Sequence, residues 1–404
     1  MARLLKAEAG ILAGASAVAT AAPPPVAVPE ADAKALVAGG NTFAIDLYKM
    51  LAAEKGNVVC SPYSVSAALA LTYAGARGET ATEMAKVLGF TALGERVHPA
   101  QADLGWRLKG DPAKGQPEFS VANALWGQRD YGFRPEFLKL TQAHYGAGLR
   151  EVDYVRDTDG ARTTINGWVG DQTKGKIPEL IPDGVLSTDT RLVLANAIYF
   201  KGSWLDKFNP KETTDDKFRV TATETVPVRM MHQHKWAVFY AGDGVKVVRL
   251  PYQGKAKSML VVVPDEVEGL AAVEGKLTAE QVAKWRAGLR EGDVQLQLPK
   301  FKATGKSRLG ETLKAMGMPL AFEAAKADFT GMTDQERLFI GAVIHEAVVE
   351  VDEQGTVAAA ATASEMVTLG VPVIVTIRAD RPFLFLIVDD ATQAILFVGR
   401  VVKP

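Results

Sequence analysis

Three short motifs in this sequence contain residue types that could bind a metal ion or a phosphate, but each lacks a required partner. "HQH" at 232–234 would place two imidazoles on one face of a strand, and no third ligand is evident. "HEAVV" at 345–349 begins like a zinc-protease helix and has no second histidine. "ATGKS" at 303–307 ends like a phosphate-binding loop, but Lys300 stands where the first glycine is needed. The sequence also has no nucleophile-elbow motif, so it predicts no metal, no cofactor and no enzymatic activity.

Cys60 is the only cysteine, so no intrachain disulfide is possible. It lies in the apolar run "NVVCSPYSVSAALAL" at 57–71. A thiol in such surroundings is typically buried and unreactive. We therefore expect Cys60 to belong to the core and not to a catalytic site.

Two polar side chains interrupt strand faces that are otherwise apolar. In the strand predicted for "TRLVLANAIYFKGSW", Asn196 shares a face with alternating leucine, isoleucine and phenylalanine. In the strand predicted for "VIHEAVVEVD", His345 shares a face with alternating valine and alanine. Buried polar groups need partners, so the two could bond each other, or Ser61 or Ser64, in one internal network. The local pattern equally allows two unrelated core residues, each satisfied separately.

A long run of small residues, "EQGTVAAAATAS" at 353–364, directly follows the second of these strands. Alanine is the best helix former, and small or polar residues tolerate exposure to solvent. Taken alone, the stretch therefore favours a short helix or a linker.

The overall composition is that of an ordinary soluble globular protein. Of the 404 residues, 48% are hydrophobic and 23% are charged, and the length allows two domains or one large one. A net charge of -1 gives no field that would attract nucleic acid or an anionic membrane. Beyond the N-terminus, no stretch is long and apolar enough to span a bilayer. We expect neither nucleic acid nor a membrane as a partner.

The N-terminal sequence has features of an export signal. Arg3 and Lys6 precede an uncharged stretch at 9–22, which contains "ATA" as a candidate cleavage site. Glu8 departs from this pattern, and the alternative is a disordered Ala/Pro extension. We expect a signal-like segment and an Ala/Pro-rich tether over residues 1–37, and a secreted or periplasmic protein.

Helical patterns come mostly first and strand patterns mostly last, which predicts an α+β arrangement. The predicted helices span 31–54, a buried segment opened by Ser61 and Pro62, a segment capped by "TATE" at 80–83, 135–146, and a segment that stops at Gly175. The predicted strands span 119–128, 190–204, 343–352 and two runs within "PFLFLIVDDATQAILFVGRVVK" at the C-terminus. The last two runs are almost continuously apolar, so we expect them to be central and covered on both faces.

Nine motifs together resemble the serpin family, over roughly residues 38–404. They are "SPYSVSAALAL" (61–71), "YAGARGET" (73–80), "NALWGQRDY" (123–131), "LVLANAIYFKGSW" (192–204), "LPYQGKAKSMLVVVPDE" (250–266), "LPKFK" (298–302), "ADFTGMT" (327–333), "VIHEAVVEVDEQGT" (343–356) and "RPFLFLI" (381–387). The resemblance implies one serpin domain over 38–404 with three β-sheets and eight or nine helices. It also implies an exposed reactive-centre loop at about 353–376, which a target protease cuts.

In inhibitory serpins the cut loop inserts as a new central strand into the main sheet. The resemblance assigns the hinge of this loop to Glu353, Gly355, Thr356, Ala358, Ala359, Ala360 and Ala361. It assigns the network beneath the point where the sheet opens to Ser61, Ser64, Asn196 and His345. Trp204 matches the residue where the loop first enters. The resemblance further implies a monomer that polymerises if it is destabilised.

The small-residue run suits a segment that is solvated in one state and a sheet strand in another. In a strand, Thr356 and Ala358 would point to one face and Val357 and Ala359 to the other, and none of them is charged or large. Ordering a residue costs about 1–2 kcal/mol of backbone entropy, and a paired amide returns about 0.5–1.5 kcal/mol. Because these terms nearly cancel, insertion must be driven by packing and by release of strain in a metastable sheet.

The family's usual spacing from Glu353 places the reactive bond between Leu369 and Gly370, with Met366, Val367 and Thr368 as alternatives. A leucine there suits the apolar first pocket of chymotrypsin-like, elastase-like or subtilisin-like enzymes. The expected function is suicide inhibition of such serine proteases. The alternative is a non-inhibitory serpin that binds a ligand or acts as a chaperone, which a bulky, charged or proline-bearing hinge would indicate.

Overall fold

The computed structural model describes residues 27–110, 116–146, 149–335, 338–355 and 374–404. The predicted export signal lies outside these residues. So do the hinge from Thr356 to Ala361 and every candidate for the reactive bond from Met366 to Gly370.

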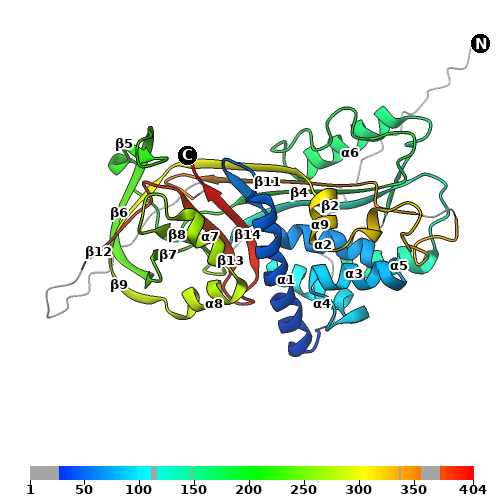
Figure 1. Cartoon of the computed structure of the whole chain (residues 1–404), viewed down its shortest axis with the longest axis horizontal. Coiled ribbons are helices and arrows are strands. Elements are labelled where there is room, and N and C mark those ends of the chain that lie inside the picture. The colour runs from blue at the N-terminus through cyan, green and yellow to red at the C-terminus, as the bar shows by residue number, and fades with distance from the viewer. Residues whose placement is uncertain (1–26, 111–115, 147–148, 336–337, 356–373) are drawn as a thin grey trace, which may run out of the picture.

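A five-stranded sheet runs through the middle of the molecule (Figure 1). Its strands, in spatial order, are β10 (Phe301–Arg308), β11 (Ala342–Val351), β4 (Leu192–Lys201), β2 (Glu118–Gln128) and β3 (Arg150–Val152). The central pair, β11 and β4, is parallel, whereas β11 pairs with β10 and β4 pairs with β2 in antiparallel fashion. The two long central strands thus meet in the less stable of the two pairing patterns.

A second, nine-stranded sheet lies mostly at one end of the molecule (Figure 1). Its strands are β1 (Val58–Cys60), β14 (Ile395–Val401), β13 (Phe383–Asp389), β8 (Lys257–Pro264), β7 (Val245–Pro251), β6 (Thr225–Gly242), β9 (Arg290–Pro299) and β12 (Val375–Arg378), with β5 (Thr214–Arg219) paired to β6. The long strand β6 pairs with β5 over 225–230, with β9 over 230–239 and with β7 over 238–242. Two of the three expected sheets are therefore joined into one hydrogen-bonded sheet. As predicted, β13 and β14 are buried along their whole length.

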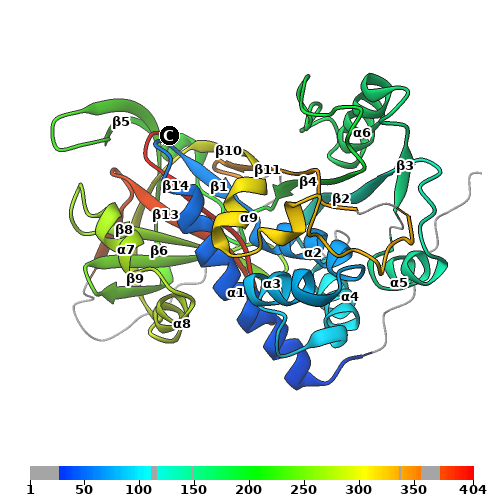
Figure 2. The same ribbon diagram turned by 45° about the vertical axis from the view of Figure 1, so that its right-hand side comes forward.

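Nine α-helices occur among the described residues: α1 (Glu30–Leu51), α2 (Pro62–Tyr73), α3 (Gly78–Leu88), α4 (Val97–Leu108), α5 (Pro135–Tyr145), α6 (Thr158–Gln172), α7 (Leu270–Lys276), α8 (Ala279–Ala287) and α9 (Gly310–Met316). Short 3-10 turns are η1 (Gly94–Arg96), η3 (Pro210–Glu212) and η4 (Leu320–Phe322). Figures 1 and 2 show α6 on one side of the five-stranded sheet and α1 to α5 on the other. Two apolar cores result, because alternate residues of β4 and β11 pack toward opposite sides.

Most of the predicted elements are confirmed within a few residues. The predicted cap at Thr80 is wrong, because the N-cap of α3 is Arg77, three residues earlier. The Thr80 hydroxyl instead accepts a hydrogen bond from the Asp328 amide at 3.0 Å. The Glu83 carboxylate accepts one from the Leu320 amide at 3.0 Å. Tertiary partners thus outcompete the local capping box.

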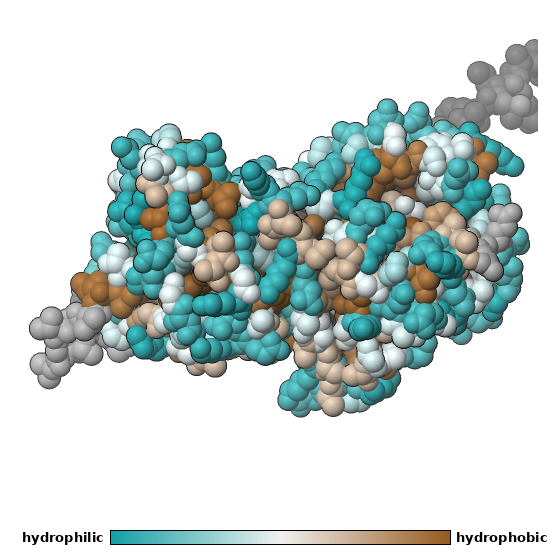
Figure 3. Space-filling view, in the orientation of Figure 1, coloured by the Kyte–Doolittle hydropathy of each residue, from teal (hydrophilic) through white to brown (hydrophobic). Residues whose placement is uncertain are grey.

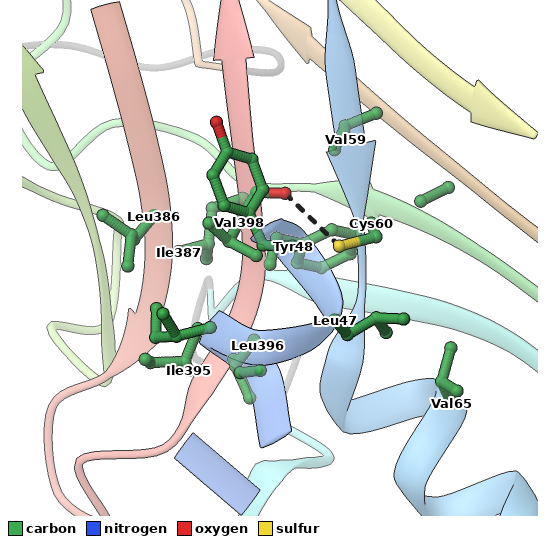
Figure 4. Packing of buried hydrophobic residues seen from close by; sticks show 14 of the residues in the cluster. Leu47, Tyr48, Val59, Cys60, Val65, Leu386, Ile387, Ile395, Leu396 and Val398 are labelled. Atoms are coloured by element: carbon green, nitrogen blue, oxygen red, sulfur yellow. Dashed lines mark hydrogen bonds between the residues drawn. The ribbon is translucent and has the colours of Figure 1, made fainter. Parts of the chain in front are cut away.

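Cys60 is a fully buried free thiol, as predicted. Figure 4 shows it among Tyr48, Leu396 and other apolar residues, with Sγ 3.8 Å from the Val398 carbonyl oxygen. Burial raises the pKa of the Cys60 thiol well above its ordinary value. The thiolate, which is the reactive form, is therefore suppressed.

Hydrophilic and hydrophobic residues are interspersed over the face seen in Figure 3. Within the described ranges, no helix is both long and apolar enough to cross a membrane. The same residues contain no group of three or more His, Cys, Asp or Glu side chains placed to hold a metal ion. His232 instead bonds Thr214 at 3.0 Å, and His234 bonds Asp293 at 2.7 Å.

The close approach of the two sheets can be tested at Gly305. A Cβ atom at this position on β10 would overlap the backbone carbonyl of Val59 on β1. Gly305→Ala should therefore lower the free energy of unfolding by about 1–3 kcal/mol. Gly275→Ala is the matched control, because a Cβ there meets nothing within 4 Å. Urea unfolding should show the control unchanged or slightly more stable, and equal stability of the two variants would contradict the proposed close approach.

Candidate functional site

Strand register places three polar residues in one row across the five-stranded sheet. His345 on β11 is opposite Asn196 on β4, and Asn196 is opposite Asn123 on β2. Helix α2 begins directly beside this row, with Ser61 as its N-cap and Ser64 in its first turn. The structure therefore brings together all four residues for which the sequence left open a shared network, and adds Asn123.

The hydrogen bonds in this network define which atoms carry protons. His345 Nε2 accepts from the Ser61 amide at 3.1 Å, so the proton of the neutral ring lies on Nδ1 and is donated to Asn196 Oδ1. Asn196 Nδ2 donates to Ser64 Oγ at 2.7 Å and to Asn123 Oδ1. These bonds therefore connect β11 to β4 and β4 to β2 directly, and they tie the three strands to the start of α2.

Burial makes this network sensitive to the loss of any partner. Ser61, Ser64, Asn196 and His345 have no exposed surface. Burial lowers the pKa of His345 to about 3, so the ring is neutral near pH 7. Leaving one buried donor or acceptor without a partner costs about 1–3 kcal/mol.

Asn123 is the member of the network that sequence reasoning missed. Its Oδ1 also accepts from Ser64 Oγ at 3.0 Å, and its Nδ2 donates to the Ser64 carbonyl at 3.3 Å. The available signal was the alternation of Val121, Asn123 and Leu125 in the strand predicted for 119–128.

A second cluster holds the end of β11, where the small-residue run begins. Trp204 Nε1 donates to the Asp352 carbonyl at 3.0 Å, and its ring stacks on Tyr252 with centroids 4.6 Å apart. The Trp204 amide also donates to the Gln354 carbonyl at 3.1 Å. Trp204 thus contacts the chain at the place where the hinge leaves the sheet.

Glu353, the first hinge residue, is held by two side chains that lie just outside other strands, Lys300 between β9 and β10 and Thr213 directly before β5. Its carboxylate lies 2.7 Å from Lys300 Nζ and accepts from Thr213 Oγ1 at 2.9 Å. Burial opposes ionisation of Glu353, but the bonds from Lys300 and Thr213 outweigh it and keep the pKa below its ordinary value. The hinge therefore begins at an ionised glutamate that is held in place by an ion pair and a hydrogen bond.

Gly355 ends the described part of the hinge and requires glycine. Its φ of 74° lies in the left-handed region, and a Cβ would overlap the backbone nitrogen of Trp204. The chain is described again from Ile374, where β12 runs parallel to β9 in the other sheet. The 18 residues between them hold the predicted reactive bond and connect the two sheets.

The comparisons with known proteins agree with this architecture. A family model described as serpin (serine protease inhibitor) matches residues 38–404. The leukocyte elastase inhibitor of Bos taurus is 42% identical over 380 residues, which cover 91% of this chain and 99% of that protein. The structure of uncleaved ovalbumin aligns with a TM-score of 0.82 at 31% identity, covering 92% of this chain and 100% of that chain. Human thyroxine-binding globulin in complex with its ligand aligns with a TM-score of 0.83 at 32% identity, covering 92% and 99%.

The chain therefore belongs to the serpin family of serine protease inhibitors. The curated relatives are named as inhibitors of a protease, which agrees with the prediction that this protein is not an enzyme.

The low pKa of His345 predicts how stability depends on pH. Between pH 6.5 and about 3 the unfolded chain binds a proton that the folded ring does not. The contribution of neutral His345 to the free energy of unfolding is therefore complete above pH 6.5. It declines as the pH falls, with a slope of up to about 1.4 kcal/mol per pH unit. His345→Gln should therefore show a flatter stability profile than the wild type in urea unfolding from pH 4 to 7. His98, whose pKa burial lowers to about 4, gives the same background in both proteins. Parallel profiles would contradict this assignment.

Proposed function

We propose that this protein is a suicide inhibitor of serine proteases that traps its target by inserting the cut loop between β11 and β4. The observation that carries the proposal is the parallel pairing of these two strands, together with the uncharged small-residue run that follows Gly355. A strand that turns back after β11 runs antiparallel to both neighbours. Insertion would replace one parallel pairing by two antiparallel ones, which are slightly more stable per residue.

The covalent step would follow ordinary acyl transfer. The protease serine oxygen attacks the carbonyl carbon of Leu369, the bond to the Gly370 nitrogen breaks, and the amine leaves with a proton from the catalytic histidine. The loop up to Leu369 is then held as an ester on the protease. From Gly355 to Leu369 the chain spans about 46 Å when extended at roughly 3.3 Å per residue. Full insertion would carry the attached protease across the molecule before water can cleave the ester.

The proposed targets have an apolar first specificity pocket. Leu369 suits chymotrypsin-like, elastase-like and subtilisin-like enzymes, and the relatives of Bos taurus and Rattus norvegicus are named inhibitors of leukocyte elastase. We propose that the functional form is an exported monomer. The uncharged stretch at 9–22 supports export.

The alternative is a non-inhibitory serpin that binds a ligand or acts as a chaperone. The fold alone does not decide between the two functions, because this chain also aligns, with a TM-score of 0.83, with thyroxine-binding globulin in complex with thyroxine. The hinge sequence "TVAAAATA" at 356–363 favours inhibition, since each residue fits between parted strands.

The site of attack is tested by Leu369→Arg. The wild type should form a complex with chymotrypsin, elastase or subtilisin that survives boiling in detergent on a denaturing gel. Leu369→Arg should shift the preference toward trypsin by at least tenfold in rate, because trypsin requires a positive charge in its first pocket. Leu369→Met is the matched control and should keep the original preference. An unchanged preference of Leu369→Arg would mean that the bond lies elsewhere in 366–370.

The trapping step is tested by Thr356→Arg. A guanidinium entering the sheet first would cost a few kcal/mol, and each 1.4 kcal/mol slows insertion about tenfold. When insertion is slower than deacylation, the ester is hydrolysed before the protease is trapped. The variant should therefore be cut at the same bond while the protease is released active. Thr356→Ser should still trap. A covalent complex that forms equally well with Thr356→Arg would rule out insertion from this end.

A further inference from the structure

A cavity of about 280 Å³ lies between β7, the end of β8 and the segment that runs from β12 into β13. Figure 1 places β7, β8 and β12 at the same end of the molecule. Val263 and Pro264 supply an apolar wall. The other lining residues carry a charge or a hydroxyl group: Lys246, Asp265, Thr376, Arg378 and Arg381. The volume is just below the range of roughly 300–1,000 Å³ that small-molecule sites occupy, so the cavity suits a small ligand.

The two arginines of this cavity are held in position by Asp380, whose side chain is 7% exposed. The carboxylate of Asp380 lies 3.0 Å from Arg378 Nε and 3.0 Å from Arg381 Nε, and Arg219 Nη2 lies 2.9 Å from both of its oxygens. Burial opposes ionisation of Asp380, but the bonds from Arg219 and Arg381 outweigh it and keep the pKa below its ordinary value. A guanidinium that is already held by a carboxylate loses little conformational entropy when it binds a further group.

The charged groups at the cavity do not cancel. Three arginines share Asp380, and one of them, Arg378, also lies 2.8 Å from Asp216. Lys246 lies 3.4 Å from Asp265. Within the described ranges, four cations therefore face three carboxylates, which leaves a surplus of one positive charge.

Several hydrogen-bond donors at the cavity are unused. Arg378 bonds through Nε and Nη2, and Arg381 bonds through Nε and Nη1. Among the residues that the structure describes, Arg378 Nη1, Arg381 Nη2 and the Thr376 hydroxyl have no hydrogen-bond partner. Thr376 and Arg378 share one face of β12, because they flank the buried Ile377. The cavity thus offers donors from neighbouring positions and a surplus of positive charge, which together favour an anion.

We propose that this cavity binds the phosphate or sulfate group of a small monoester, with Arg378, Arg381, Lys246 and Thr376 as its donors. Such a group presents three terminal oxygens, whereas a carboxylate presents two, and the guanidinium fork matches its geometry. The apolar wall at the end of β8 would contact the organic part of the ligand. A bound anion would connect β12 to β7 and stabilise the folded protein by mass action. This site does not depend on the proposed function.

The test titrates phenyl phosphate and phenyl sulfate into the full-length protein by isothermal titration calorimetry at low salt. At least one of them should bind at a single site and should raise the melting temperature. Lys246→Gln should weaken binding about fivefold, and Thr376→Val should weaken it about threefold to tenfold. Neither residue contacts Asp380, so both variants should fold like the wild type. Lys284→Gln is the matched control, because it removes the same charge from a lysine that is 58% exposed and lies outside this cavity.

The dependence of binding on pH shows which anion the cavity prefers. The second pKa of a phosphate monoester is about 6, so phenyl phosphate should bind more weakly below that pH, whereas phenyl sulfate keeps its charge. The tighter of the two ligands at pH 7.5 identifies the source of the anion as a phosphorylated or a sulfated small molecule.

Four results would overturn the inference. The first is that neither probe shows saturable binding. The second is that the wild type, Lys246→Gln and Thr376→Val bind with equal affinity. The third is that Lys284→Gln weakens binding as much as Lys246→Gln does, which would indicate a diffuse effect of charge. The fourth is that a heparin oligosaccharide displaces phenyl phosphate and binds far more tightly, which would assign the cavity to a polysaccharide. Protease trapping is measured separately, so none of these results bears on the proposed function.

Discussion

The hydrogen bond between His345 and Asn196 joins the two parallel strands at the centre of the main sheet, and the other features of the site depend on it. Acceptance of the Ser61 amide by the other ring nitrogen requires a neutral imidazole, which burial ensures by lowering the pKa of His345 to about 3. This second ring nitrogen, Nε2, accepts a hydrogen bond from the Ser61 amide, so the start of α2 is fixed to the same histidine. Parting β11 from β4 must break the bond between His345 and Asn196, two fully buried side chains, at a cost of about 1–3 kcal/mol for each group left unpaired.

The pair of strands is held at two places that differ in chemistry. At the centre the contacts are neutral hydrogen bonds among buried side chains. At the end of β11, Trp204 bonds the backbone and Glu353 forms an ion pair with Lys300. Between and around them the packing is apolar, with α6 on one side and α2 on the other. A barrier made of a few specific contacts is consistent with a sheet that stays closed until the loop is cut and then opens along its whole length.

The fold could be predicted from the sequence because its motifs are specific and its strands alternate clearly. Local pattern also singled out Asn196 and His345, but it could not decide whether they touch. That contact depends on parallel pairing between strands about 150 residues apart, and register of this kind leaves no local trace. Asn123 interrupts an apolar alternation in the same way, but its contact with Asn196 also depends on strand register. Thr80 was misassigned as a cap because its partner, the Asp328 amide, is distant in sequence. The reactive bond remains a prediction, since it lies outside the described residues.

Metastability of the closed sheet is the central claim, and the melting temperature of cut protein tests it most directly. Intact protein and protein cut within 366–370 should be compared by circular dichroism, with both fragments still associated. If the cut loop enters between β11 and β4, the cut form has an additional central strand and a relieved sheet, so it should melt far above the intact form. A cut form that melts at or below the temperature of the intact protein would contradict a metastable sheet and leave the non-inhibitory function as the better account.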